Sequence, residues 1–176
     1  LQLQTMGLTL MYVGCETGDD LLLEKVQKGE SFESSLVALT KIKNACMKSS
    51  VMILNGLGGS KYSEQHAINS ARLMNAAQPD YLATLVITFY HGEERFQQAF
   101  GGDFSALKPA ELFNEMEILL QHLELDKTIF RSDHASNYLI LKGILGRDKE
   151  RLVKQVQDAI HNQDSAGLRQ EWQRGF

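Results

Sequence analysis

The stretch from Leu8 to Asp20, LTLMYVGCETGDD, decides the fold that this sequence predicts. It opens as a mostly apolar run, interrupted only by Thr9, which is typical of a strand buried on both faces. At Gly14 the run changes to small and acidic residues that suit a loop. In parallel α/β folds, the loops beyond the carboxyl ends of strands gather the groups that bind ligands. Glu16 is therefore the first candidate for a functional side chain.

The same pattern of strand, loop and helix recurs further along the chain. A helix with Ser31 as its N-cap follows the first strand, with apolar residues at every third or fourth position. Residues 50–54 predict a second buried strand, which a helix over residues 63–77 follows. Residues 81–89 predict a third strand, again buried on both faces. These repeats favour an α/β fold of parallel strands with right-handed crossovers.

The remainder of the chain is less regular. Residues 90–108 predict a long irregular loop, a kind of segment that is usually functional or disordered. Pro109 suits the first turn of a helix that runs to about Leu123. A short strand over residues 128–131 follows, and we expect Asp148 to cap a final helix.

Length and composition predict one α/β domain that covers residues 1–176. A chain of 176 residues with 43% hydrophobic residues can form one substantial core but not two. Its 18 basic and 22 acidic residues do not run in blocks, so we expect no nucleic-acid partner. Cys15 and Cys46 lie far apart, which argues against a disulfide framework and favours a reducing, cytoplasmic location. No apolar run approaches the roughly 20 residues of a membrane-spanning helix, so we expect no membrane partner.

Glu16 and the glycine-rich loop over residues 55–60 each have two interpretations. The Glu16 carboxylate is placed to accept hydrogen bonds from vicinal hydroxyls, as acids after the strands of dinucleotide-binding folds do. Alternatively, it interacts with the dipole of a helix that begins near Asp19. The glycines of residues 55–60 would let a ligand approach the backbone, but Lys61 breaks the GxGxxG pattern and no P-loop lysine follows. The alternative for this loop is a tight turn.

A dense polar group follows the fourth predicted strand. It comprises Arg131, Asp133, His134, Asn137 and Tyr138. Such a set of charged and hydrogen-bonding side chains suits the anchoring of a polar substrate. The alternative is a set of polar contacts that holds an irregular turn in place.

A second polar group, His91, Glu93, Glu94 and Arg95, follows the third predicted strand. His91 and Glu94 are a conceivable metal pair. Two carboxylates beside an arginine are more typical of a solvated surface, so we predict no metal site.

Four segments carry a family resemblance. They are YVGCETGDDLLLEKVQKG (12–29), VMILNGLGG (51–59), PDYLATLVITF (79–89) and FRSDHASNYLILKG (130–143). Together they resemble the C-terminal part of the barrel of radical S-adenosylmethionine (SAM) enzymes, in the subgroup of iron-sulfur oxidoreductases related to oxygen-independent coproporphyrinogen oxidase. The last segment is the most specific of the four.

The resemblance implies a fold and a set of cofactor contacts. The fold would be the C-terminal part of a partial (β/α)6 barrel, followed by C-terminal helices. In the family, a [4Fe-4S] cluster on a CxxxCxxC loop reduces SAM to a 5'-deoxyadenosyl radical. Carried over by position, Glu16 would contact the SAM ribose. Leu54 and the backbone at Asn55 and Gly56 would border the adenine.

The sequence departs from the family by an absence. It contains no CxxxCxxC motif and no strands equivalent to the first three of the barrel. We therefore expect the C-terminal portion of a longer oxidoreductase, inactive and without a cofactor when alone, whose partners are its N-terminal half and an unidentified small-molecule substrate. The alternative is a non-catalytic α/β binding or assembly module with a degenerate ligand site. In either case the open sheet edge beside the first strand predicts homo-oligomers.

Overall fold

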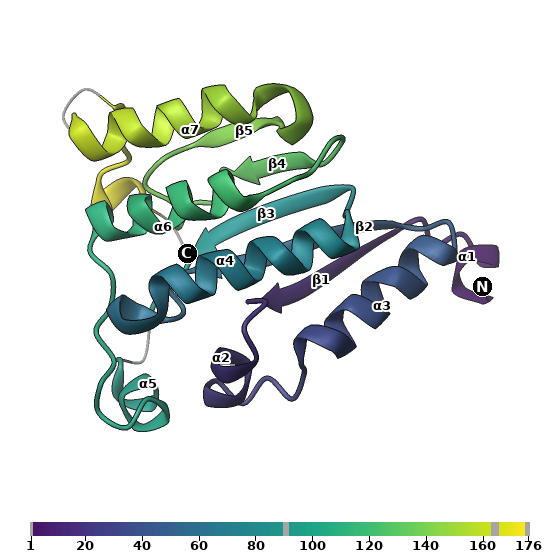
Figure 1. Cartoon of the computed structure of the whole chain (residues 1–176), viewed down its shortest axis with the longest axis horizontal. Coiled ribbons are helices and arrows are strands. Elements are labelled where there is room, and N and C mark those ends of the chain that lie inside the picture. The colour runs from purple at the N-terminus through teal and green to yellow at the C-terminus, as the bar shows by residue number, and fades with distance from the viewer. Residues whose placement is uncertain (1, 90–91, 163–165, 175–176) are drawn as a thin grey trace.

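A five-stranded sheet forms the centre of the computed structural model, which describes residues 2–89, 92–162 and 166–174 (Figure 1). The strands are β1 (Leu10–Glu16), β2 (Lys48–Asn55), β3 (Tyr81–Val86), β4 (Ile129–Ser132) and β5 (Leu141–Ile144). They lie side by side in chain order; β1 to β4 are parallel and β5 runs antiparallel to β4. The predicted α/β fold with parallel strands is confirmed.

The long helices cover one face of this sheet. They are α3 (Phe32–Asn44), α4 (Gly59–Ala77), α6 (Pro109–His122) and α7 (Leu145–His161). Figure 1 shows α3, α4 and α6 in front of the strands that they connect, with α7 beside α6. Short helices complete the chain: α1 (Gln2–Thr5), α2 (Asp20–Lys25), α5 (Glu94–Ala99) and the 3-10 helix η2 (Glu171–Gln173). Strands in sequential order with crossovers of one hand place all the connecting helices on the same side.

The main core lies between the sheet and these helices. Alternate residues of β2, Val51 and Ile53, are fully buried against them. Other large, fully buried side chains of this core are Leu73, Met74, Leu82, Leu120, Leu123, Phe130, Leu141, Leu145 and Leu152. The period of two in β2 follows from the pleat of a strand, which sends successive side chains to opposite faces.

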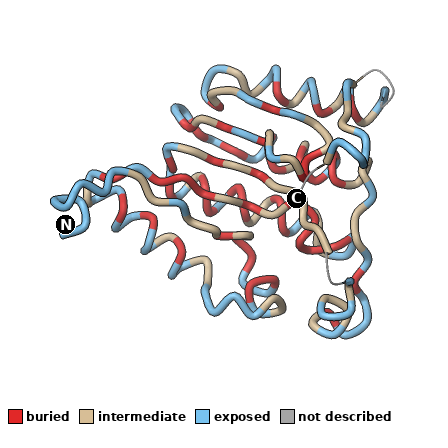
Figure 2. Tube along the Cα trace, turned by 180° about the vertical axis from the view of Figure 1, so that it is seen from behind, coloured by how far each residue is buried: buried red, intermediate tan, exposed pale blue. Residues whose placement is uncertain are grey.

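The opposite face of the sheet, hereafter the bare face, carries no helix in the part of the chain that the structure describes. Figure 2 shows the strands from this side, in front of the helices. Its side chains come from alternate strand positions: Leu10, Tyr12, Ser50, Met52, Leu54, Tyr81, Ala83, Leu85, Ile129 and Arg131. Tyr12 is 74% exposed. The prediction that β1 and β3 are buried on both faces is therefore wrong for this chain, because apolar side chains of both strands lie on an uncovered surface.

Several sequence predictions for the helices are confirmed. Ser31 caps α3, since its hydroxyl accepts a hydrogen bond from the Ser34 N–H at 3.1 Å. Pro109 is the first residue of α6. Helix α4 begins at Gly59, four residues earlier than the predicted Ser63.

Other elements differ from the predictions. The expected loop over residues 90–108 contains α5, whose Phe96 packs with Phe89, Phe100 and Phe104 in a second, smaller core. The strand β5 was not predicted. Helix α7 begins at Leu145, so Asp148 lies inside the first turn, where its carboxylate accepts a hydrogen bond from the Ile144 N–H at 2.8 Å.

No helix within the described residues is both long enough and apolar enough to cross a membrane.

Candidate functional site

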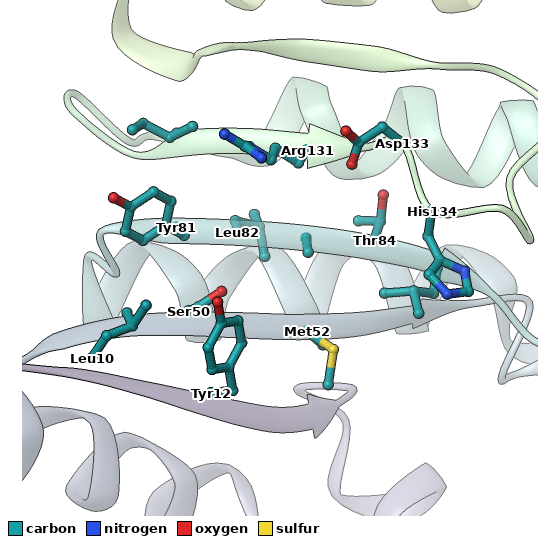
Figure 3. A pocket seen from close by; sticks show the side chains of 13 residues that line it. Leu10, Tyr12, Ser50, Met52, Tyr81, Leu82, Thr84, Arg131, Asp133 and His134 are labelled. Carbon is teal, nitrogen blue, oxygen red and sulfur yellow. The ribbon is translucent and has the colours of Figure 1, made fainter. Parts of the chain in front are cut away.

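A cavity of about 420 Å³ lies over the bare face, and Figure 3 shows the side chains that line it. Its labelled members are Leu10, Tyr12, Ser50, Met52, Tyr81, Leu82, Thr84, Arg131, Asp133 and His134. Ligand cavities of proteins have volumes of roughly 300–1,000 Å³, so this one is large enough for a small molecule.

The strand register arranges the cavity floor in rows that run across the sheet. Tyr12, Ser50, Tyr81 and Ile129 form one row. The next row, closer to the carboxyl ends of the strands, contains Gly14, Met52, Ala83 and Arg131. Because Ala83 is small, the floor is low between Met52 and Arg131, whereas the Glu16 side chain lies over Gly14.

Glu16 lies at the carboxyl end of β1, beside the second row. A register shift between Gly14 and Glu16, together with a φ of +65° at Glu16, turns its side chain back over Gly14. A Cβ on Gly14 would collide with Glu16 Oε1, so a side chain at this position would displace the Glu16 carboxylate. Lys28 Nζ donates to Glu16 Oε1 at 2.9 Å, whereas Oε2 receives no hydrogen bond from a described residue. The carboxylate therefore keeps an oxygen that is free to accept a ligand hydroxyl.

The alternative interpretation of Glu16 as a helix-dipole residue is not supported by the position of α2. Asp19 is the N-cap of that helix, and its Oδ1 accepts a hydrogen bond from the Leu22 N–H at 3.0 Å. Its Oδ2 accepts hydrogen bonds from Gln65 Nε2 at 2.7 Å and from Asn69 Nδ2. Asp19 therefore fills the capping role, while the Glu16 side chain folds back over Gly14.

The other predicted cofactor residues are divided between the two faces of the sheet. Leu54 alternates with the buried Ile53 and lies on the bare face. The Asn55 side chain faces the helices, where it lines a small space of about 20 Å³ together with Phe113 and Asn137. Its Oδ1 has no hydrogen-bond partner among the described residues.

The glycine loop after β2 packs against protein. Gly56 has a φ of +85°, and a Cβ there would lie 3.1 Å from a methyl carbon of Leu112. A Cβ on Gly59 would lie 2.8 Å from the carbonyl oxygen of Ser105. These contacts are those of a tight turn, the alternative interpretation that the sequence leaves open for this loop.

The structure separates the polar group after β4 into two sets. Arg131, Asp133 and His134 line the cavity over the bare face. Asn137 and Tyr138 face the helix layer instead. The sequence predicts all five as one group, but the turn between β4 and β5 directs them to opposite sides.

Asn137 continues the sheet where β4 has ended. Its Nδ2 donates to the Thr84 carbonyl at 2.8 Å and its Oδ1 accepts from the Val86 N–H at 2.9 Å. The side chain is 3% exposed. The Asn137 amide therefore takes the place of the β4 backbone as the hydrogen-bond partner of the end of β3. This role is structural.

Tyr138 is held by the C-terminal segment. Its hydroxyl donates to Glu171 Oε1 at 2.5 Å, and the Arg174 guanidinium lies 3.7 Å from the centre of its ring. Burial, followed by the hydrogen bond to Glu171, raises the pKa of Tyr138 to about 12. Tyr138 is therefore protonated at neutral pH and fixes the tail on the turn.

Arg169 is a residue of this region that the sequence did not single out. Its guanidinium donates to the carbonyls of Asp133, His134 and Asn137, at 3.2, 2.6 and 3.2 Å. The tail thus fixes the turn that carries the cavity residues.

A buried polar network that the sequence did not predict lies beneath the loops after β1 and β2. Thr17 Oγ1 lies 2.8 Å from His66 Nδ1, and His66 Nε2 lies 3.8 Å from Glu115 Oε1. Glu115 accepts hydrogen bonds from the Gly56 N–H at 2.7 Å and from Ser63 Oγ at 2.6 Å. This network joins the loops after β1 and β2. The signal for it was an acid, Glu115, within the apolar stripe of α6.

The cysteines do not fit an iron-sulfur cluster. Cys15 is buried near the carboxyl end of β1, while the exposed Cys46 precedes the amino end of β2, so they lie at opposite ends of a parallel pair. Within the described ranges, no group of three or more His, Cys, Asp or Glu side chains is arranged so that it could hold a metal ion. His91, the candidate metal partner of Glu94, lies outside the described residues.

Comparison with known proteins adds no family assignment. No protein-family model matches the sequence, and no curated protein matches it significantly.

Proposed function

We propose that this chain is the C-terminal portion of a radical SAM iron-sulfur oxidoreductase, and that the bare face forms part of the interior of its barrel. The observation that carries the proposal is the one-sided covering of the sheet. Parallel strands in sequential order, with connecting helices on one face, have the layout of a barrel segment, whereas doubly wound sheets carry helices on both faces. The resemblance of the motifs around Glu16 and Arg131 to those of radical SAM enzymes supports this choice of family.

The open edge of β1 and the bare face together define what would complete the barrel. β1 pairs with β2 on one side and with no described strand on the other. The bare face is apolar over Leu10, Met52 and Leu85. Further βα units that pair with β1 and curve over the bare face would satisfy both surfaces. The N-terminal half of the same protein is the partner that we propose.

The geometry of Glu16 fits the ribose of SAM. Its carboxylate lies on the bare face at the carboxyl end of β1, where barrels place their ligands, and one of its oxygens is free. Glu16 would accept hydrogen bonds from the two ribose hydroxyls, and Lys28 would hold the carboxylate in place. When bound together with a reduced [4Fe-4S] cluster, SAM supplies radical chemistry. The two cysteines of this chain do not fit that cluster, so we derive no step through it and propose that the chain is inactive alone.

A cytoplasmic location is part of the proposal. Cys46 is exposed and unpaired. Free thiols and iron-sulfur chemistry both suit a reducing compartment.

The role of Glu16 can be tested by SAM affinity. Isothermal titration calorimetry would compare the protein that includes the sequence encoded upstream with its Glu16→Gln variant. We expect at least a tenfold loss of affinity, because glutamine removes the charge that strengthens hydrogen bonds from hydroxyls. Glu33→Gln, an exposed acid in the first turn of α3, is the matched control and should bind as the wild type does. Equal affinity of wild type and Glu16→Gln would remove Glu16 from the ribose site, and absence of SAM binding to the wild type would overturn the proposed function.

A further inference from the structure

We propose that Arg131 binds the carboxylate of the substrate, whose apolar body lies on Met52 and Ala83. As a statement about a substrate, this inference rests on the proposed function. The binding site itself is formed by residues of this chain and can be tested without SAM.

Arg131 is the charged side chain of the cavity that is free to bind a ligand. It is exposed on the bare face at the end of the second row, and it makes no hydrogen bond or ion pair with any residue in the described part of the chain. Its neighbour Asp133 already receives a hydrogen bond from Lys142 Nζ at 2.8 Å. That hydrogen bond holds the pKa of Asp133 below its ordinary value. Arg131 and Lys142 with Asp133 leave an excess of one positive charge at this end of the cavity.

His134 is held in position at the carboxyl-end side of the same cavity (Figure 3). Its Nδ1 accepts a hydrogen bond from the Ser136 N–H at 3.1 Å, so the neutral ring carries its proton on Nε2. The His134 carbonyl is bound by Arg169. His134 therefore presents a fixed donor at the carboxyl-end side of the cavity, apart from the Arg131 guanidinium (Figure 3).

The floor of the cavity suits an apolar body. Met52 and Ala83 lie in the same row as Arg131, and Tyr81 lies in the row behind them. Ala83 pairs with Arg131 in the strand register, so its small side chain leaves space beside the base of the Arg131 side chain. A flat or flexible apolar group with a terminal carboxylate would cover this surface.

This position is separate from the proposed SAM contact. Glu16 lies on β1 and Arg131 on β4, three strand spacings apart, which amounts to about 14 Å at about 4.8 Å per spacing. The two ends carry opposite free groups, a carboxylate oxygen and a guanidinium. A substrate carboxylate at Arg131 would therefore leave the β1 end for a second molecule.

One arginine fork matches a carboxylate better than a phosphate group. The guanidinium presents two parallel N–H donors that fit a planar carboxylate. Phosphate sites usually add a glycine-rich nest or the N-terminus of a long helix, and the glycine loop after β2 packs against Leu112 and Ser105 instead.

The test uses the 176-residue chain and two probe molecules, 2-naphthoate and the neutral 2-naphthamide. Nuclear magnetic resonance titration would follow backbone amides and the Arg131 Nε–H. We expect saturable shifts with 2-naphthoate at Arg131, Ala83 and Met52, and at least fivefold weaker binding of 2-naphthamide. Equal affinity for the two probes, saturable shifts that map elsewhere, or no saturable shift with 2-naphthoate would overturn the proposal.

Variants of Arg131 test whether its charge is the one that binds 2-naphthoate. Arg131→Gln should weaken binding of 2-naphthoate at least fivefold, and Arg131→Lys should retain part of it. Arg147→Gln is the control, since Arg147 is exposed on α7 and pairs with Asp148. Unchanged affinity of a folded Arg131→Gln variant would overturn the proposal, and the comparison of the two probes on the wild type decides the matter if that variant does not fold. Failure of SAM binding would leave these results unaffected, so the two proposals fail separately.

Discussion

At the scale of single residues, the neighbours Cys15 and Glu16 at the end of β1 lie in different environments, one in the core and one on the bare face. Cys15 faces the helices and is 3% exposed, while Glu16 turns back over Gly14 on the bare face. The sequence places an acid at the end of an apolar run, which was enough to select Glu16. The register shift and the positive φ that direct its side chain depend on pairing with β2, so they could not be predicted from local sequence.

The environment of Cys15 predicts its reactivity. Burial, together with the neighbouring Glu16 carboxylate, raises the pKa of the Cys15 thiol from 9.0 to about 11. Because the thiolate is the reactive form, we expect one rapidly labelled thiol in the folded chain at pH 8, that of Cys46. A kinetic assay with a thiol reagent, repeated on Cys46→Ser and in denaturant, measures this. Two thiols that react equally fast in the folded protein would contradict it.

The same shift has a consequence for stability. The unfolded chain loses the Cys15 proton near pH 9 and the folded chain near pH 11. The contribution of Cys15 to the free energy of unfolding is therefore constant below about pH 9, and this free energy falls as the pH rises toward 11. Cys15→Ala should remove this part of the pH dependence in urea unfolding, and an unchanged alkaline profile would show that Cys15 does not titrate in this way.

At the scale of elements, periodicity was sufficient for the longer helices and the parallel strands. Helices α3 and α6 present apolar residues every three or four positions, and their caps, Ser31 and Pro109, were visible in the sequence. The strand β5 has only four residues, which is too short for a period to be recognised, and it leads directly into α7. Helix α5 has six residues and is held by aromatic contacts from other segments.

The turn between β4 and β5 shows that a high density of polar residues in the sequence does not by itself identify a binding site. Five polar residues within eight positions predicted either an anchor or a structural knot, and the turn contains both. Which residue has which role depends on Arg169 and on the end of β3. Contacts between segments more than 30 positions apart are not visible in local patterns.

The structural role of Asn137 predicts a clear loss of stability. Asn137→Ala removes the Asn137 donor to the Thr84 carbonyl and leaves the Val86 N–H with only the longer hydrogen bond to Ser136 Oγ, at 3.2 Å. We expect the free energy of unfolding to fall by roughly 1–3 kcal/mol. Urea denaturation measures this change. Arg131→Gln, six positions away and exposed, is the control and should change the free energy of unfolding by less than about 0.5 kcal/mol. Equal losses for both variants would show that the turn does not separate the two roles.

At the scale of the whole molecule, the disagreement about burial is informative. The sequence predicted strands covered on both faces, and the structure covers one. The apolar residues behind that prediction lie on the bare face as Leu10, Met52 and Leu85, next to an open β1 edge. The apolar residues of a strand predict that its surface is buried, but they do not identify the segment that covers it.

The open edge and the bare face predict self-association of this chain. We expect small-angle scattering at high concentration to show dimers or larger species, because an unpaired strand edge recruits another strand. Tyr12→Lys places a charge on the exposed edge strand and should reduce association. Trp172→Lys, which alters a residue of similar exposure in η2, is the control and should not. A monodisperse monomer, or equal effects of the two variants, would contradict this expectation.

The most direct test of the proposed function is SAM cleavage by the protein that includes the in-frame coding sequence upstream of Leu1. After anaerobic reconstitution with iron and sulfide and addition of a reductant, chromatography would measure 5'-deoxyadenosine. The proposed function predicts a CxxxCxxC motif in that upstream sequence, iron-dependent formation of 5'-deoxyadenosine, and none from the 176-residue chain alone. An upstream sequence without the motif, or a reconstituted protein that forms no 5'-deoxyadenosine, would contradict it.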